Sequence, residues 1–178
     1  MAPISPTEFS VRAARLRLLL FDVDGVLTDG SVNVDATGGE LKRFHIRDGA
    51  ALAYAQRAGL LTGVLSARAS GATTARTQEL KMAVVVQGVA DKRVALTEIL
   101  AAQQLTPEEV AYMGDDLVDL PVMRLVGLSA APADAATEVA AAAHFVTWHS
   151  GGEGAVREFI EAVLKARGQW DDVLTHFA

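Results

Sequence analysis

The sequence predicts an α/β fold, namely a Rossmann-like parallel sheet sandwiched by helices, with a β-hairpin inserted after the first strand and no lid domain. Short apolar runs alternate along the chain with segments of helical length, and this order indicates parallel strands covered on both faces. Polar side chains follow several of these runs, where ligands bind in such sheets. The 178 residues are enough for one domain with a buried core.

The first half of the chain begins with a capping pattern. Ser5, Pro6 and Glu8 predict a short helix before the first strand, which we place at residues 16–21. A hairpin over about 31–44 follows, with its turn at 35–39. The next expected elements are a helix at 48–58 that ends at Gly59, a strand at 60–65, a helix at 69–80 and a strand at 83–86.

The second half continues the alternation. Thr106 and Pro107 repeat the start signal just before an apolar run. The elements expected here are helices at 91–104, 117–126, 135–143 and 154–167, and strands at 110–113, 127–129 and 144–147. A C-terminal helix and tail occupy about 153–178. Trp170, Leu174 and Phe177 make the tail amphipathic, so it either packs on its own helix or docks on a neighbouring subunit.

Composition and charge exclude several classes of function. The formal net charge of −6 argues against nucleic-acid and anionic-membrane partners. Cysteine is absent, so the chain has neither disulfides nor a thiolate metal site, which fits a cytoplasmic location. The first ten residues lack the pattern of a signal peptide, and no apolar run has the length of a transmembrane helix.

Asp22 and Asp24 are the most informative residues. They leave the first strand two positions apart and precede Gly25. At strand spacing they would point the same way. Two like charges held together need a cation or a proton between them. The alternative is that Asp22 and Asp24 are ordinary turn residues, but the pair predicts a functional site.

Three further candidate site residues follow this pair along the chain. Ser66 follows the second buried strand, Lys92 starts a helix, and Asp115 follows another strand in the run Gly114 to Asp119. Taken alone, each has an ordinary explanation as a loop serine, a solvated lysine or a helix cap. In a parallel sheet, Asp22, Ser66 and Asp115 would converge at the carboxyl edge.

The order and spacing of these four points resemble the four motifs of the haloacid dehalogenase superfamily of phosphotransferases. The resemblance covers almost the whole chain. It implies that Asp22 attacks phosphorus and forms an aspartyl-phosphate, while Asp24 serves as acid and then base. Ser66 would donate to a phosphoryl oxygen, and Lys92 would offset the developing charge.

The same resemblance implies a Mg²⁺ cofactor. The side chains of Asp22 and Asp115 and the main-chain carbonyl of Asp24 would be its ligands. Asp116 and Asp119 would lie next to the metal ligands without binding the ion themselves. Asp119 would orient Lys92 or a magnesium-bound water.

The spacing between these motifs indicates which branch of the superfamily the chain resembles. Only 41 residues separate Asp24 from Ser66, and 25 separate Ser66 from Lys92, so neither gap holds a lid domain. Together with residues 114–116, the segments 44–49, 87–92 and 151–158 look like the lidless tetrameric branch that hydrolyses sugar-acid phosphates. This resemblance implies a homotetramer, with hairpins forming a central barrel and a C-terminal segment reaching a neighbour's site.

The implied substrate is 3-deoxy-D-manno-octulosonate 8-phosphate, an intermediate on the way to lipopolysaccharide. Its expected contacts are Asp24, His45, Ile46, Arg47, Asp48, Gly49, Arg68, Arg76 and Lys92. For Arg76, an exposed helix face is the alternative. Arginines suit a substrate that carries both a carboxylate and a phosphate.

Some residues depart from the pattern of this branch. Ala67 replaces a glycine of the second motif, His45 replaces a frequent asparagine, and Ala53 and Glu153 stand where basic residues are common. A nine-carbon keto-sugar acid phosphate or another small phosphomonoester is therefore an alternative substrate. A non-catalytic accessory subunit with the same fold is an alternative of another class, which the intact aspartates and Lys92 oppose.

Overall fold

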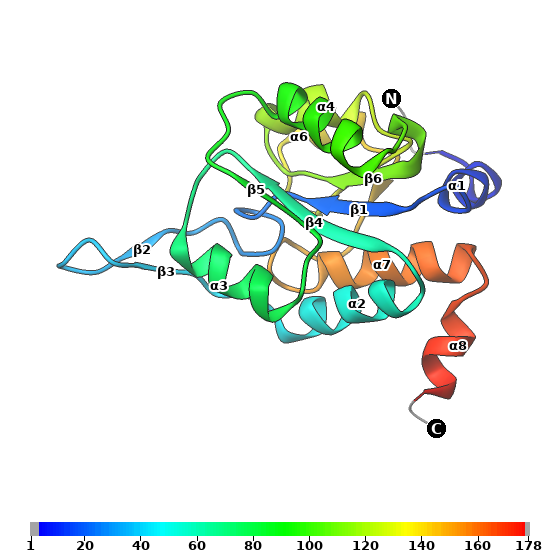
Figure 1. Cartoon of the computed structure of the whole chain (residues 1–178), viewed down its shortest axis with the longest axis horizontal. Coiled ribbons are helices and arrows are strands. Elements are labelled where there is room, and N and C mark those ends of the chain that lie inside the picture. The colour runs from blue at the N-terminus through cyan, green and yellow to red at the C-terminus, as the bar shows by residue number, and fades with distance from the viewer. Residues whose placement is uncertain (1–3, 177–178) are drawn as a thin grey trace.

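The computed structural model describes residues 4–176. This part of the chain contains a six-stranded sheet of order β5-β4-β1-β6-β7-β8 and a separate two-stranded hairpin (Figure 1). All neighbours in the large sheet are parallel, which confirms the predicted fold class. Its strands are β1 (Leu18–Phe21), β4 (Leu61–Ser66), β5 (Val84–Gln87), β6 (Val110–Met113), β7 (Leu128–Ala131) and β8 (Phe145–Val146).

Helices cover both faces of this sheet (Figure 1). They are α1 (Pro6–Ala13), α2 (Ile46–Arg57), α3 (Gly71–Glu79), α4 (Lys92–Gln103), α5 (Leu120–Met123), α6 (Thr137–Ala142), α7 (Ala155–Ala166) and α8 (Trp170–Thr175), with the 3-10 turns η1 (Pro107–Glu109) and η2 (Leu117–Asp119). Strand side chains alternate between two cores. Leu19 and Phe21 pack with α1, α2 and α7, whereas Leu18 and Leu20 pack with α4 and α5. No helix among residues 4–176 is long and apolar enough to cross a membrane.

The predicted hairpin is present as β2 (Asn33–Val34) and β3 (Glu40–Leu41), an antiparallel pair that projects away from the sheet (Figure 1). Its turn is held by Asp35, whose Oδ1 accepts hydrogen bonds from the backbone N–H groups of Thr37 and Gly39 at 2.8 Å each. The paired strands are shorter than expected. Val34 and Leu41 remain exposed in the single chain, so the hairpin presents apolar side chains to its surroundings.

The helix expected at 117–126 is wrong in its type and extent. The structure has a 3-10 turn at Leu117–Asp119 and a short α5 that ends at Met123. The reason is the side chain of Asp119, which bonds back to the N–H groups of Asp115 and Asp116. These bonds tighten the first turn, and they keep the chain close to the end of β6.

The described part of the tail after α7 packs against residues of the same chain. The ring of Trp170 lies 6.4 Å from that of Tyr54. The charged ends of Arg157 and Lys165 lie over the ring of Trp170 in cation–π contacts. This is the packing alternative of the sequence prediction. Phe177 lies outside the described residues.

Candidate active site

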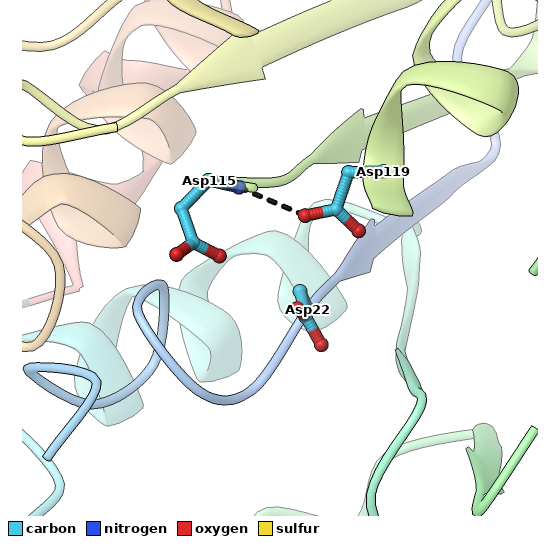
Figure 2. Close-up of side chains that lie close together, drawn as sticks. All are labelled: Asp22, Asp115 and Asp119. Atoms are coloured by element: carbon cyan, nitrogen blue, oxygen red, sulfur yellow. Dashed lines mark hydrogen bonds between the residues drawn. The ribbon is translucent and has the colours of Figure 1, made fainter. Parts of the chain in front are cut away.

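Three carboxylates gather where β1 and β6 end. Asp22 follows β1, and Asp115 and Asp119 follow β6, its parallel neighbour. Each of the three offers an oxygen, and these oxygens lie within 4.8 Å of one another (Figure 2). The carboxyl edge of the central strands therefore brings together residues that are far apart in sequence.

Lys92 bridges two of these carboxylates. Its Nζ lies 2.9 Å from Asp22 Oδ2 and 2.6 Å from Asp119 Oδ1. Only 4% of Lys92 and 7% of Asp22 are exposed, so the ion pairs are shielded from water. Asp91 caps α4 and accepts from the N–H groups of Arg93 and Val94, which fixes the helix start that carries Lys92.

Asp119 organises the loop that carries Asp115. Its Oδ2 accepts from the N–H of Asp115 at 2.9 Å, as Figure 2 shows, and from the N–H of Asp116 at 3.2 Å. Its Oδ1 accepts from Lys92 and, at 2.6 Å, from the hydroxyl of Tyr112. The side chain of Asp116 instead caps η2 through the N–H of Leu117.

The cluster holds more negative charge than Lys92 balances. Burial raises the pKa of Asp22 to about 6, and the charge of Asp119 adds to this while Lys92 opposes it. Burial, followed by the charges of Asp22 and Asp119, raises the pKa of Asp115 to about 8. Burial also pulls the pKa of Lys92 down, but the two carboxylates beside it outweigh this effect and raise it.

These features fit a divalent cation that prefers oxygen ligands. Asp115 Oδ1 is buried and, among the described residues, has no hydrogen-bond partner. The backbone also leaves room only for glycine beside this carboxylate, because a β-carbon on Gly25 would lie 2.0 Å from Asp115 Oδ2. A cation held by Asp22 and Asp115 would neutralise the excess charge of the cluster and engage the unpaired oxygen.

Asp24 faces the stem of the hairpin. Its carboxylate pairs with Lys42, whose side chain is only 1% exposed, and lies 3.4 Å from Arg68 Nη1. Both cations also contact Glu40, at 3.1 and 3.2 Å. Since β1 ends at Phe21, the strand spacing that predicted a common direction for Asp22 and Asp24 does not extend to them.

Ser66 ends β4, the other neighbour of β1. It is buried, and its Oγ accepts from the N–H of Arg68 at 3.3 Å. Because β4 and β1 are parallel, Ser66 and Asp22 lie at the same edge of the sheet.

The remaining predicted substrate residues form a second group around the start of α2. Asp48 is buried, and its Oδ1 accepts from the N–H of Arg157 in the first turn of α7 at 2.7 Å. A β-carbon on Gly49 would lie 2.3 Å from Arg76 Nη2, so these two residues are closely packed. Arg76 also stacks on Phe44, 5.8 Å from the ring centre, and the exposed helix face considered for it is wrong.

His45, Ile46 and Arg47 border an open cavity of about 500 Å³ between α2 and α7. Over residues 4–176, its lining includes none of the three clustered carboxylates. The segment therefore lines a cavity to which neither these carboxylates nor Lys92 contributes in the described part of the chain.

Comparison with known proteins gives the family. A model of haloacid dehalogenase-like hydrolases matches residues 61–160. This chain belongs to that family. A 3-deoxy-D-manno-octulosonate 8-phosphate phosphatase of Yersinia pestis is 44% identical over 156 residues, which cover 88% of this chain and 83% of the relative.

Solved structures of similar proteins superpose on this hydrolase over nearly its whole length. A probable YrbI-family phosphatase of Pseudomonas syringae superposes with a TM-score of 0.94 at 41% identity, covering 96% of this chain and 97% of the other. The 3-deoxy-D-manno-octulosonate 8-phosphate phosphatase of Moraxella catarrhalis, solved with magnesium, phosphate and the sugar acid, gives a TM-score of 0.94 at 31% identity, with coverages of 97% and 99%.

Sequence reasoning missed two residues at the site of this hydrolase. Lys42 lies in the predicted hairpin, two residues after Glu40 and so on the same strand face, but the hairpin was interpreted only as a contact between subunits. Tyr112 was read only as part of an apolar strand. A tyrosine there signals a polar contact, because a buried hydroxyl needs a partner.

Proposed function

We propose that this hydrolase is a magnesium-dependent phosphatase that forms an aspartyl-phosphate on Asp22, and that its substrate is 3-deoxy-D-manno-octulosonate 8-phosphate. The observation that carries the proposal is the contact of Lys92 with both Asp22 and Asp119, beside Asp115. The named activity of relatives that cover most of the chain supports the choice of substrate.

The side chains of Asp22 and Asp115 and the carbonyl of Asp24 would hold Mg²⁺. When bound, the ion supplies positive charge that lets a carboxylate approach a phosphate dianion. Asp119 would keep the Asp115 loop in place through its two backbone hydrogen bonds.

Asp22 would form a bond to phosphorus while the bond from phosphorus to the sugar oxygen breaks. Lys92, already 2.9 Å from Asp22 Oδ2, would stabilise the charge that moves onto the phosphoryl oxygens. Ser66 would donate its hydroxyl to one of these oxygens.

Asp24 would give a proton to the departing sugar oxygen and then take one from the water that attacks the aspartyl-phosphate, which releases phosphate. The contacts of Lys42 and Arg68 with Asp24 support a fixed position for this carboxyl. Arg68 would also be available to the sugar acid, because its side chain is 44% exposed.

Self-association would complete the site. The exposed hairpin, and a cavity beside His45, Ile46 and Arg47 that none of the three clustered carboxylates lines among the described residues, support a homotetramer in which neighbouring subunits close the sites. The proposed setting is the cytoplasm, in the supply of sugar acid for lipopolysaccharide.

A substrate panel tests the proposal. Phosphate release would be measured with Mg²⁺ from the eight-carbon sugar-acid phosphate, a nine-carbon keto-sugar acid phosphate and simple phosphomonoesters, with Asp22→Asn as control. We expect the highest kcat/KM for the eight-carbon compound and no turnover by the variant. A preference for the nine-carbon compound would replace the substrate. Equal activity of Asp22→Asn would remove the mechanism, and inactivity of the wild type on the whole panel would favour an accessory subunit.

A further inference from the structure

Tyr112 lies in the middle of the sheet with its hydroxyl among the charged groups of the site. It sits on β6 and is completely buried, on the face that packs against α4 and α5. Its OH is 2.6 Å from Asp119 Oδ1, 3.2 Å from Lys92 Nζ and 3.4 Å from the carbonyl oxygen of Leu65. Neither the family resemblance nor the proposed chemistry uses this residue.

The distances fix the direction of each hydrogen bond. A phenol has one proton to donate, and the carboxylate of Asp119 is both the nearest and the strongest acceptor. The oxygen of Tyr112 then accepts from Lys92. The ammonium of Lys92 has three protons and three acceptors, namely Asp22, Asp119 and Tyr112. Each proton of Lys92 therefore has its own partner.

We propose that Tyr112 is a positioning residue that holds Lys92 against Asp22, and this inference rests on the proposed phosphatase function. Asp119 attracts Lys92 at 2.6 Å, more closely than Asp22 does at 2.9 Å. Tyr112 donates to the same oxygen of Asp119 and offers Lys92 a third acceptor. Without the hydroxyl, Lys92 is free to move toward Asp119 and away from the reacting carboxylate.

A rigid ring on a central strand suits this task. β6 is hydrogen-bonded to both β1 and β7, and β1 carries Asp22 at its end. The hydroxyl is thus fixed relative to Asp22, whereas Lys92 reaches the site through a flexible four-carbon side chain. Tyr112 itself is completely buried, so its role would be to place Lys92 and not to contact phosphate or sugar.

Tyr112→Phe removes one oxygen and preserves the ring. We expect kcat to fall by about tenfold to a hundredfold, with KM changed by less than about threefold, because Lys92 acts on the transition state. Thr62→Val is the matched control. Thr62 is also completely buried on a strand of the sheet, and its hydroxyl accepts from Gln56 Nε2 rather than from a residue of the site, so kcat should be unchanged. A lower melting temperature with an unchanged kcat would show a structural role and overturn the proposal.

A double-mutant cycle tests whether the effect passes through Lys92. In a Lys92→Arg background the added Tyr112→Phe change should have a clearly different effect on kcat, since the acceptor pattern of the cation has changed. Equal factors in both backgrounds would overturn the proposal. Absence of activity in the wild type would instead contradict the proposed function.

If Tyr112→Phe does not fold, a spectroscopic measurement replaces it. In a Tyr54→Phe background, 3-fluorotyrosine labels position 112 alone. Orthovanadate with Mg²⁺ should shift its ¹⁹F resonance in the wild-type site and have much less effect with Lys92→Ala. An unchanged resonance on saturation with vanadate would contradict coupling between Tyr112 and the reacting groups.

Discussion

The backbone of Gly25 lies directly against the carboxylate of Asp115, and a β-carbon there would come within 2.0 Å of Oδ2. Gly25 also has a φ of +89°, in the region that favours glycine. The turn after the first two aspartates and the loop after β6 therefore fit together only without a side chain at position 25.

Gly25→Ala should weaken magnesium binding. The new methyl group must displace Asp115, so we expect the dissociation constant for Mg²⁺ to rise at least about tenfold, with a loss of about 1 kcal/mol or more in stability from the positive φ. Isothermal titration with Mg²⁺ and thermal unfolding would measure the two effects. Gly59→Ala is the control, because Gly59 has a φ of +84° and open space around its β-carbon position. Equal magnesium affinity in both variants would contradict the proposed ligand.

Magnesium should stabilise the protein more strongly as the pH rises. Asp22 and Asp115 have folded-state pKa values of about 6 and 8, above the ordinary value of 3.8. The folded chain therefore binds more protons than the unfolded chain, and the stability of the metal-free protein falls as the pH rises through this window. Mg²⁺ binds the deprotonated carboxylates, so its stabilising effect grows over the same range.

The measurement is the melting temperature with and without Mg²⁺ between pH 6 and pH 9. We expect the difference to grow by about 3 °C for each pH unit until Asp115 is ionised. Asp115→Asn should flatten this dependence. A constant difference across the range in the wild type would contradict a metal site at these carboxylates.

The sequence predicted the carboxyl-edge residues because strand order alone brings them together. Asp22, Ser66 and Asp115 each stand at or just after the end of a predicted strand. The three strands β4, β1 and β6 are neighbours in the sheet, so convergence follows from the parallel order. The family and the fold class were predicted on the same residues and are confirmed.

Side-chain partners across the chain could not be predicted in this way. The contact of Lys42 with Asp24 depends on how the hairpin stem folds back, which strand patterns do not specify. The packing of Gly49 on Arg76 depends equally on how α2 and α3 meet. The tight turn at Asp119 was missed because its side chain replaces helical backbone bonds, and periodicity alone does not reveal that.

Asp48 should act mainly on stability. Its buried carboxylate accepts from the N–H of Arg157 and thereby caps the first turn of α7. Asp48→Ala leaves that N–H unpaired and should cost about 2 kcal/mol, or about 4–8 °C in melting temperature. Asp48→Asn retains an acceptor and should melt close to the wild type. Steady-state kinetics at low temperature tests the alternative that Asp48 contacts the substrate. That alternative predicts a raised KM for both Asp48→Ala and Asp48→Asn.

The hairpin should control assembly. Val34 and Leu41 are 64% and 68% exposed in the single chain, more than a soluble hairpin needs, and two aspartates there would repel across an interface. We expect Val34→Asp with Leu41→Asp to convert the proposed tetramer to smaller species in light scattering after gel filtration. Val11→Asp on α1, where the side chain is 53% exposed, is the control and should leave the mass unchanged.

The double variant Val34→Asp with Leu41→Asp also tests whether the assembly closes the active site. If neighbouring subunits exclude water from the phosphoryl group, dissociation should lower kcat for the sugar-acid phosphate at least about tenfold. Hydrolysis of a small phosphomonoester, which gains little from contacts with a neighbour, should change less. Because Lys42 ties the hairpin stem to Asp24, Lys42→Ala serves as a second comparison. It should lower kcat for both substrates while the measured mass stays that of the wild type. Dissociated protein with full activity on the sugar-acid phosphate would show that each subunit carries a complete site.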